Sequence, residues 1–146
     1  MSALPRWLPY ANRVVKTANR LGMPLGTIRI LEVPGRTSGN PRATPVSPLT
    51  VEGRDYVIAG LPQADWALNA AAAGHGIMAH RRRRWPVRLT EVTDQATCRL
   101  VMRAFPEQVP GGVPFFVKIG LVDGPDPDQF EQAADRVRVF QILSAT

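Results

Sequence analysis

Residues 34–45 read PGRTSGNPRATP, and this stretch is the most informative part of the sequence. Within it, residues 35–42 hold two glycines, two hydroxyl side chains (Thr37 and Ser38) and two arginines (Arg36 and Arg42). Glycine permits a positive φ, so consecutive backbone amides can face one concavity that binds an anion. The hydroxyl and guanidinium groups can donate further hydrogen bonds to phosphate oxygens. The stretch predicts a phosphate-binding loop, or alternatively a plain hairpin connection, because turns use the same residue types.

The two common nucleotide motifs are absent from this stretch. No Gly-Lys-Ser/Thr follows it, as a Walker loop requires, and no G-x-G-x-x-G opens a helix. Its flanks indicate strands instead. Residues 27–33 alternate in polarity up to the break at Pro34-Gly35, and residues 46–51 and 55–60 predict a hairpin around Glu52-Gly53.

The rest of the chain predicts a small mixed fold. Helices are expected over residues 10–21, over 65–73 with Gly74 as C-cap, over 94–105 with Thr93 or Asp94 as N-cap, and from Asp126-Pro127 to about Asp135. In the third of these, Leu100, Val101 and Phe105 are expected to face inward. Strands are expected over 76–80, 85–92 and 136–143, and the Pro- and Gly-rich residues 106–114 predict an irregular loop that forms a lid or a pocket wall. Because most strands follow one another through short turns, the fold class is α+β, an antiparallel sheet or small barrel with peripheral helices.

Length and composition bound the class of protein. The 146 residues are enough for one domain, which we expect to span residues 1–146. Cys98 is the single cysteine, so no intramolecular disulfide can form, and a reducing compartment fits that count. The sequence has no run of about 18 apolar residues and no unbroken apolar stretch near its start. The expected location is cytoplasmic.

The formal net charge is +6, and the basic excess lies in the first two thirds of the chain. A phosphorylated cofactor, nucleic acid or an anionic membrane surface would suit that charge. Residues 81–85 read RRRRW, which predicts a solvated basic turn; nucleic-acid binding by backbone contact and stacking is the alternative. We expect no nucleic-acid partner. His75 and His80 have no ligand-forming neighbours at suitable spacing, so no metal site is expected.

Three segments together resemble a known family. They read Gly35-Arg36-Thr37-Ser38-Gly39-Asn40-Pro41-Arg42-Ala43-Thr44-Pro45, then Val57-Ile58-Ala59-Gly60, then Trp66-Ala67-Leu68-Asn69. A strand, G-R-x-S/T-G-x-x-R-x-x-P, a strand hairpin and W-x-x-N-L in that order are the pattern of the deazaflavin-dependent nitroreductases of actinobacteria. The resemblance covers about residues 27–93. It implies a split β-barrel, antiparallel and with peripheral helices, that binds coenzyme F420 rather than FMN.

The resemblance also implies residue roles. The loop would hold the cofactor's phosphate, and the strand hairpin would line the flat deazaflavin ring. The implied cofactor-binding residues are Arg36, Thr37, Ser38, Gly39, Arg42, Pro45, Ser47, Ile58, Ala59, Gly60 and Trp66. Trp66 would pack near the ring or anchor its helix in the core, and Asn69 would tie helix to loop. Phe105, Phe115 and Phe116 are candidates for the apolar face of the site, with core packing as the alternative.

The implied reaction is hydride transfer from reduced deazaflavin to an activated C=C, a quinone or a nitroaromatic, a small hydrophobic electron acceptor. The chain departs from the family pattern at Thr37, where the best-known members carry Lys, and at Ser47, where they carry an aromatic residue. Its tyrosines, Tyr10 and Tyr56, are both early, so no proton donor is implied and the catalytic residue is unknown. The alternative is a non-catalytic split-barrel protein that binds a lipid, acyl or quinone ligand by peripheral contact with an anionic membrane. Either protein is expected to be a monomer or weak homodimer.

Overall fold

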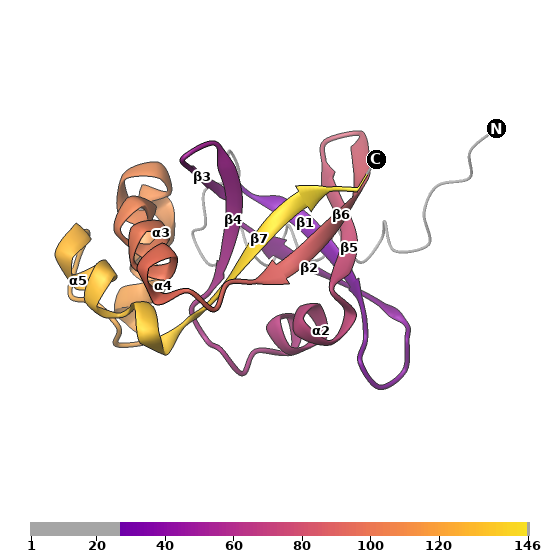
Figure 1. Cartoon of the computed structure of the whole chain (residues 1–146), viewed down its shortest axis with the longest axis horizontal. Coiled ribbons are helices and arrows are strands. Elements are labelled where there is room, and N and C mark those ends of the chain that lie inside the picture. Colours follow the sequence, from indigo (N-terminus) through magenta and orange to yellow (C-terminus); the bar gives the residue numbers. More distant parts are fainter. Residues whose placement is uncertain (1–26, 146) are drawn as a thin grey trace.

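Seven strands form one antiparallel sheet in the computed structural model, which describes residues 27–145 (Figure 1). The strands are β1 (Arg29–Pro34), β2 (Pro41–Val46), β3 (Leu49–Val51), β4 (Arg54–Ala59), β5 (His75–His80), β6 (Arg83–Glu91) and β7 (Arg138–Ser144). Their order across the sheet is β2-β1-β5-β6-β7-β4-β3, and each neighbouring pair is antiparallel. The predicted helix over residues 10–21 lies outside the described residues.

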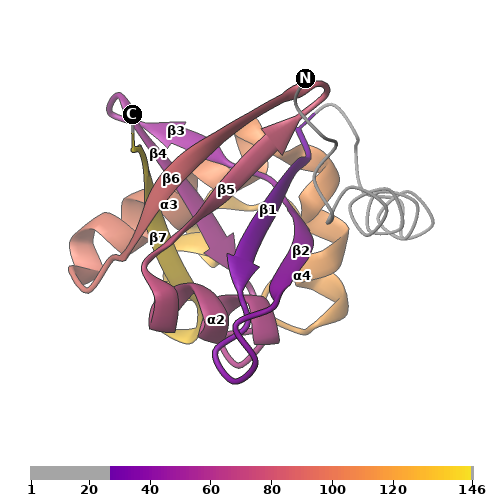
Figure 2. The same ribbon diagram turned by 90° about the vertical axis from the view of Figure 1, so that its right-hand side faces the viewer.

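Three hairpins build most of this sheet. The β1–β2 turn spans residues 35–40, the predicted phosphate loop. The β3–β4 turn centres on Glu52 and Gly53, as predicted, with φ angles of 53° and 77°. The β5–β6 turn holds Arg81, whose φ of 57° lies in the left-handed region. The sheet curls so that the β3–β4 and β5–β6 turns lie at one end and α2 (Asp65–Ala73) and the β1–β2 turn lie at the other (Figures 1 and 2).

Three of the predicted helix boundaries are confirmed by their capping residues, whereas the last predicted helix is shorter than expected and ends at Gln132, not near Asp135. The helix α2 ends at Gly74, whose φ of 71° suits the left-handed C-cap. Asp94 caps α3 (Gln95–Gln108) by accepting a hydrogen bond from the Ala96 N–H. Asp126 caps α5 (Pro127–Gln132) in the same way. Among residues 27–145, none of the helices combines the length and apolar character needed to cross a bilayer.

Two apolar cores stabilise the fold, one on each side of the sheet. The interior core fills the curled sheet and is closed below by α2, with Leu31, Val33, Val57, Ala67, Met78 and Phe140 among its members. The second core lies between the sheet and the layer formed by α3, α4 (Val113–Lys118) and α5, which Figure 1 shows beside β3, β4 and β7. Strand β4 contributes to both cores because Tyr56 and Val57 face opposite sides.

The expected irregular loop over residues 106–114 is wrong. Residues 106–108 continue α3, a 3₁₀ turn follows over Pro110–Gly112, and α4 begins at Val113. Buried side chains at Phe105, Val109, Val113 and Phe116 explain this, because their spacing is helical and they pack in one core. Burial of this face outweighs the helix-breaking tendency of the prolines and glycines between them.

Two smaller expectations also need correction. Leu100 does not face inward: it is 46% exposed, and the inner face of α3 carries Cys98, Val101, Met102 and Phe105. The single strand expected over residues 46–51 is also wrong: β3 covers only Leu49–Val51, and a separate strand, β2, ends at Val46 and begins at Pro41 because the β1–β2 turn closes over only six residues. The architecture itself is as predicted: an α+β fold with an antiparallel split barrel and peripheral helices.

Candidate functional site

The β1–β2 turn is closed mainly by its own hydrogen bonds. The Gly35 N–H donates to the Asn40 carbonyl at 2.8 Å, and the Gly39 N–H donates to the Gly35 carbonyl at 2.8 Å. The Asn40 N–H donates to Ser38 Oγ at 3.1 Å. A Cβ on Gly35 would lie 3.1 Å from Ser38 Oγ and 3.3 Å from the Asn40 oxygen, so a larger residue there would require the turn to shift slightly. Three of the six backbone N–H groups of residues 35–40 therefore bond within the turn.

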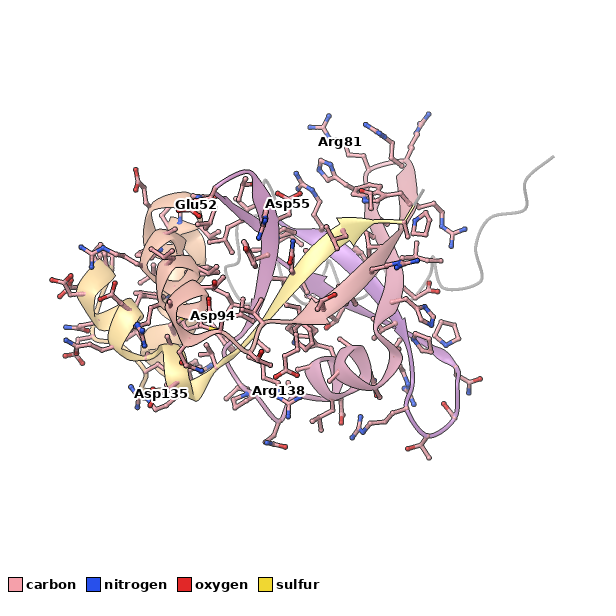
Figure 3. All side chains as sticks on the ribbon, viewed as in Figure 1. Glu52, Asp55, Arg81, Asp94, Asp135 and Arg138 are labelled. Carbon is pink, nitrogen blue, oxygen red and sulfur yellow. The ribbon has the colours of Figure 1, made fainter. Side chains whose placement is uncertain are left out.

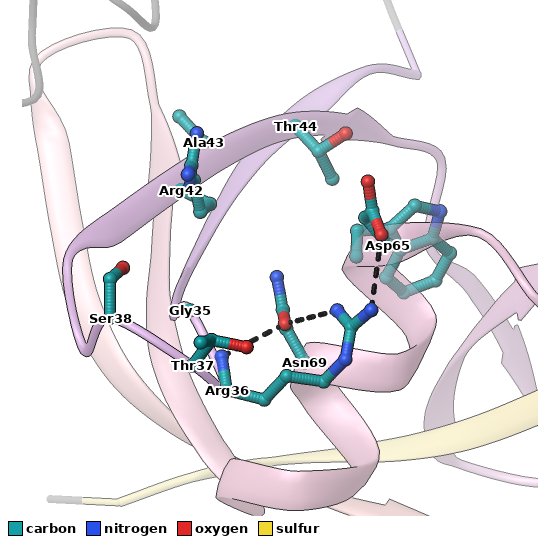
Figure 4. Close-up of a pocket in the computed structure, with 10 residues that line it drawn as sticks. Gly35, Arg36, Thr37, Ser38, Arg42, Ala43, Thr44, Asp65 and Asn69 are labelled. Atoms are coloured by element: carbon teal, nitrogen blue, oxygen red, sulfur yellow. Dashed lines mark hydrogen bonds and ion pairs between the residues drawn. The ribbon is translucent and has the colours of Figure 1, made fainter.

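Arg36 is fixed to helix α2 and does not extend freely into solvent. Its backbone N–H and its Nη1 donate to Asn69 Oδ1 at 3.0 and 2.8 Å, and its Nη2 lies 3.2 Å from Asp65 Oδ1 (Figure 4). Asn69 is 4% exposed, so its side chain anchors the turn from a buried position. The structure confirms the expected tie between helix and loop. The Arg36 guanidinium therefore braces the turn, and its charge is partly balanced by Asp65.

Arg42 has a different environment. It lies on β2 two residues before Thr44, and residues two apart on a strand point to the same face. Its register partner on β1 is Val33, which belongs to the interior core, so Arg42 continues the inner face of the sheet past its buried end. No hydrogen bond or ion pair links the Arg42 side chain to another residue of the described part of the chain. Its guanidinium is exposed and available to an anion.

These side chains surround a polar cleft of about 500 Å³ between the β1–β2 turn and α2 (Figure 4). Its lining comprises Gly35, Arg36, Thr37, Ser38, Arg42, Ala43, Thr44, Asp65, Trp66 and Asn69. Two guanidinium groups and one carboxylate give the lining a formal charge of +1. The charge and the hydroxyl groups favour an anion over a cation.

A second, apolar cavity of about 210 Å³ adjoins the cleft, and Thr44 and Trp66 line both. Its lining comprises Thr44, Pro45, Val46, Ser47, Ile58, Ala59, Gly60, Leu61, Ala64, Trp66, Phe105, Gly112, Phe115 and Phe116. We call this cavity the apolar slot. A Cβ on Gly60 would lie 3.0 Å from Phe115 and 3.1 Å from Phe116, so the missing side chain keeps this part of the slot open.

The structure brings nearly all of the expected site residues together. Those expected at the phosphate (Arg36, Thr37, Ser38 and Arg42) line the cleft, and those expected at the ring (Pro45, Ser47, Ile58, Ala59 and Gly60) line the slot. Trp66 lies at the junction, and its ring centroid is 6.0 Å from that of Phe140, so it packs against the interior core, which was one of its two expected roles. Gly39 lines neither cavity; its φ of 74° serves the turn.

Two residues that line the cleft, Asn69 and Asp65, had no expected part in ligand binding. The Asn69 amide nitrogen points from α2 into the cleft (Figure 4), and no residue in the described range accepts a hydrogen bond from it. It is therefore free to donate a hydrogen bond into the cleft. Asp65 adds a negative charge to the cleft lining; it lies in the first turn of α2, where a carboxylate is favourable, and it pairs with Arg36. Asp65 and Asn69 are four residues apart, so they lie on one face of α2, and this spacing was the signal in the sequence that could have grouped them.

The slot has no ionisable lining. None of its lining residues in the described part of the chain is an acid, a base, a tyrosine or a cysteine, and its hydroxyl groups come from Thr44 and Ser47. Across residues 27–145, no three His, Cys, Asp or Glu side chains gather where they could hold a metal ion. The arrangement suits binding and orientation of a flat apolar group beside an anion, and it assigns no acid or base.

The residues present fit a phosphorylated deazaflavin in chemical type. Such a group needs oxyanion donors at one end and a narrow apolar space at the other. Arg42, the Asn69 amide nitrogen and the hydroxyls of Thr37 and Ser38 form the first part. The slot kept open at Gly60 forms the second.

Comparison with known proteins gives the fold and no family. No family model and no curated protein sequence matches this chain. An F420-H2 dependent reductase is similar in structure, with a TM-score of 0.54 at 18% identity over 80% of this chain and 93% of its own. A conserved hypothetical protein from Mycobacterium tuberculosis has a TM-score of 0.57 at 12% identity, covering 90% of this chain and 80% of its own.

A similar fold also occurs in a protein that is described as a storage protein and not as a reductase. The heme storage protein of Vibrio cholerae has a TM-score of 0.52 at 8% identity and covers 93% of this chain and 91% of its own. At these identities the likenesses show the split barrel alone.

Proposed function

We propose that this chain is an F420H2-dependent reductase that passes a hydride to an activated C=C, a quinone or a nitroaromatic acceptor. One observation carries the proposal: the polar cleft beside Arg42 and the apolar slot share Thr44 and Trp66 in their linings, so the two lie side by side. A phosphate and a flat ring joined by a short linker need those two environments side by side. Likeness of fold to an F420-H2 dependent reductase supports this choice over other phosphorylated cofactors.

In this proposal the cleft binds and positions the phosphate. Arg42 supplies the unpaired guanidinium, and the Asn69 amide and the hydroxyls of Thr37 and Ser38 donate neutral hydrogen bonds. Arg36 acts indirectly, because its guanidinium is bound to Asn69 and Asp65 and holds the turn in place. Arg42 is therefore the residue on which affinity for the phosphate depends most.

The slot orients the ring and excludes water. Pro45 and Ile58 form apolar walls, and Gly60 allows close approach of the ring to the backbone. When bound, reduced deazaflavin supplies the hydride. The slot offers no ionisable side chain in the described part of the chain, so any proton for the acceptor comes from solvent or through the Thr44 and Ser47 hydroxyls. Catalysis would then rest on orientation.

Titration of the purified protein with F420 and, separately, with FMN tests the proposal. We expect F420 to bind more tightly than FMN and Arg42→Ala to weaken F420 binding by about tenfold or more, the loss typical of one charge-assisted contact. Arg99→Ala is the matched control, because Arg99 is exposed on α3, away from the cleft lining. Equal F420 affinity in the wild type and Arg42→Ala, or no F420 binding by the wild type, would refute the proposal.

A second candidate is a non-catalytic protein that carries a lipid, acyl or quinone ligand. The apolar, non-ionisable slot favours it, as do Leu61 and Phe115, which line the slot yet are 49% and 39% exposed. Such a protein would remain cytoplasmic and contact anionic membranes peripherally. Co-sedimentation with anionic vesicles, together with absence of F420 uptake, would select this candidate. Retained F420 binding would select the reductase.

A further inference from the structure

A third cavity lies at the other end of the barrel. Figures 1 and 2 place the β3–β4 and β5–β6 turns at the end opposite α2, and a cavity of about 430 Å³ opens there. We call it the upper mouth. Its lining includes Arg29, Arg54, Asp55, Trp85, Gln141 and Ser144. None of these residues lines the cleft or the slot.

Strand alternation explains why polar side chains face this mouth. Residues two apart on a strand share a face, and Leu31, Val57 and Val87 belong to the interior core. The residues two positions before them, Arg29, Asp55 and Trp85, therefore point to the same interior, near its open end. Ser144 pairs in register with Val87 and joins them from β7. The barrel is thus apolar at its centre and polar at this mouth.

The lining of the mouth holds two guanidinium groups and one carboxylate, a formal charge of +1. Arg54 at its rim is exposed, and its guanidinium forms no hydrogen bond or ion pair with another residue of the described chain. The Arg83 guanidinium lies over the Trp85 ring, 6.0 Å from its centroid. Asp55 is the one acidic residue in the lining, and its Oδ1 accepts the Thr50 hydroxyl at 2.6 Å.

The side-chain view shows where this charge gathers. Figure 3 labels Arg81 on the β5–β6 turn at the same end as Asp55, well away from Asp135 and Arg138. The arginines of this turn therefore add positive potential around the mouth and attract anions toward it.

We propose that the upper mouth is a second binding site, for a small oxyanion such as a phosphate or a carboxylate. The guanidinium groups of Arg29 and Arg54 supply charged donors, and Ser144 supplies a hydroxyl. A small ligand fits better than a polymer because the donors surround a concave cavity, with Arg29 and Ser144 facing inward and Arg54 at the rim, and do not form a flat strip. The site is independent of the proposed reductase function, since it shares no residue with the cleft or slot.

Two-dimensional NMR can test this site separately from the cleft. The reporter is the Trp85 indole N–H, which lies at the mouth, whereas Trp66 lies at the cleft and reports on the first site. Inorganic pyrophosphate and citrate are the two probes, one for phosphate and one for carboxylate. We expect saturable shifts of the Trp85 signal with at least one probe, and about tenfold weaker binding in Arg54→Ala.

Matched variants make the result decisive. Arg99→Ala removes the same charge from α3 and should leave the Trp85 titration unchanged. Arg42→Ala should alter Trp66 shifts only. The proposal is overturned if neither probe gives a saturable Trp85 shift, or if Arg54→Ala titrates like the wild type. It is also overturned if duplex DNA or anionic vesicles shift this end of the barrel while both small probes do not.

Discussion

Asn69 Oδ1 accepts two hydrogen bonds from Arg36, from the backbone N–H at 3.0 Å and from Nη1 at 2.8 Å. One buried amide oxygen therefore fixes both the backbone of the β1–β2 turn and the direction of its first arginine. The same amide group turns its nitrogen toward the cleft (Figure 4). Asn69 thus connects the stability of the turn to its capacity to bind an anion.

Two substitutions at Asn69 separate these roles. Asn69→Ala removes the acceptor and leaves two Arg36 donors unsatisfied, so we expect a loss of about 2 kcal/mol in the free energy of unfolding. Asn69→Asp keeps an acceptor for Arg36 but places a carboxylate oxygen where the amide nitrogen faces the cleft. It should keep most of the stability and still lose F420 binding. Urea unfolding and F420 titration of both variants measure the two effects.

The contrast between the two Asn69 variants is the critical result. If Asn69→Asp binds F420 as well as the wild type, the amide nitrogen does not face the phosphate. If Asn69→Ala is as stable as the wild type, the Arg36 hydrogen bonds contribute little to the turn.

Gly60 sets the width of the apolar slot. A Cβ there would lie 3.0 Å from Phe115 and 3.1 Å from Phe116, distances that force the rings to move. Phe115 is 39% exposed and can shift outward, so Gly60→Ala should cost only about 1 kcal/mol in stability. We expect it to weaken F420 binding by about tenfold, the effect of one misplaced methyl group in an apolar pocket.

The double variant Gly60→Ala/Phe115→Ala is the control for this prediction. Removing the Phe115 ring makes space for the added methyl group, so the fold should relax and part of the F420 affinity should return. A Gly60→Ala protein that binds F420 normally would mean that the ring lies outside the slot.

The sequence predicted which residues of the turn line the cleft better than it predicted what each of them contacts. The glycines, hydroxyls and arginines of the turn come together at the cleft, because a tight hairpin keeps residues 35–42 close regardless of the rest of the fold. The role of Arg36 could not be derived from that stretch alone, because its partners Asn69 and Asp65 lie about thirty residues further on, in α2. The upper mouth likewise depends on the pairing of distant strands.

Helix α4 shows where local composition fails to predict secondary structure. Pro114 lies within it, and Pro110 and two glycines lie just before it in the 3₁₀ turn; by local preference these residues indicate a loop. The burial of Val113 and Phe116 against Phe105 decides otherwise, and that contact exists only once α3 and α4 meet in the second core. Local composition therefore fails where tertiary burial supplies the dominant free energy.

Glu32 on β1 predicts a specific pH dependence. Its Oε2 is buried and lacks a hydrogen bond among the described residues, and burial raises its pKa, partly offset by the positive charge of Arg84. The folded protein therefore holds this proton more tightly than the unfolded chain does. Stability from this group is full below the unfolded pKa and falls as the pH rises through the folded pKa.

Glu32→Gln should remove the loss of stability that the Glu32 carboxylate causes as the pH rises. We expect the variant to be more stable than the wild type at neutral pH and the difference to shrink in acid, where Glu32 is protonated in both states. Urea unfolding across the pH range measures it, with Glu107→Gln on α3 as an exposed control that should show no such trend. A variant that is less stable at neutral pH would mean that the carboxylate is stabilised by its surroundings.

The β3–β4 turn offers a stabilising change beside the upper mouth. Glu52 and Gly53 both have positive φ angles, 53° and 77°, as in a type I′ hairpin turn. A glutamate in this region is strained, whereas asparagine adopts it readily and Asn-Gly is the preferred pair. We expect Glu52→Asn to raise the free energy of unfolding by about 1 kcal/mol. Glu52→Ala removes the same charge without the conformational preference, so it separates relief of backbone strain from reduced charge. If both variants stabilise equally in thermal unfolding, charge and not backbone conformation limits this turn.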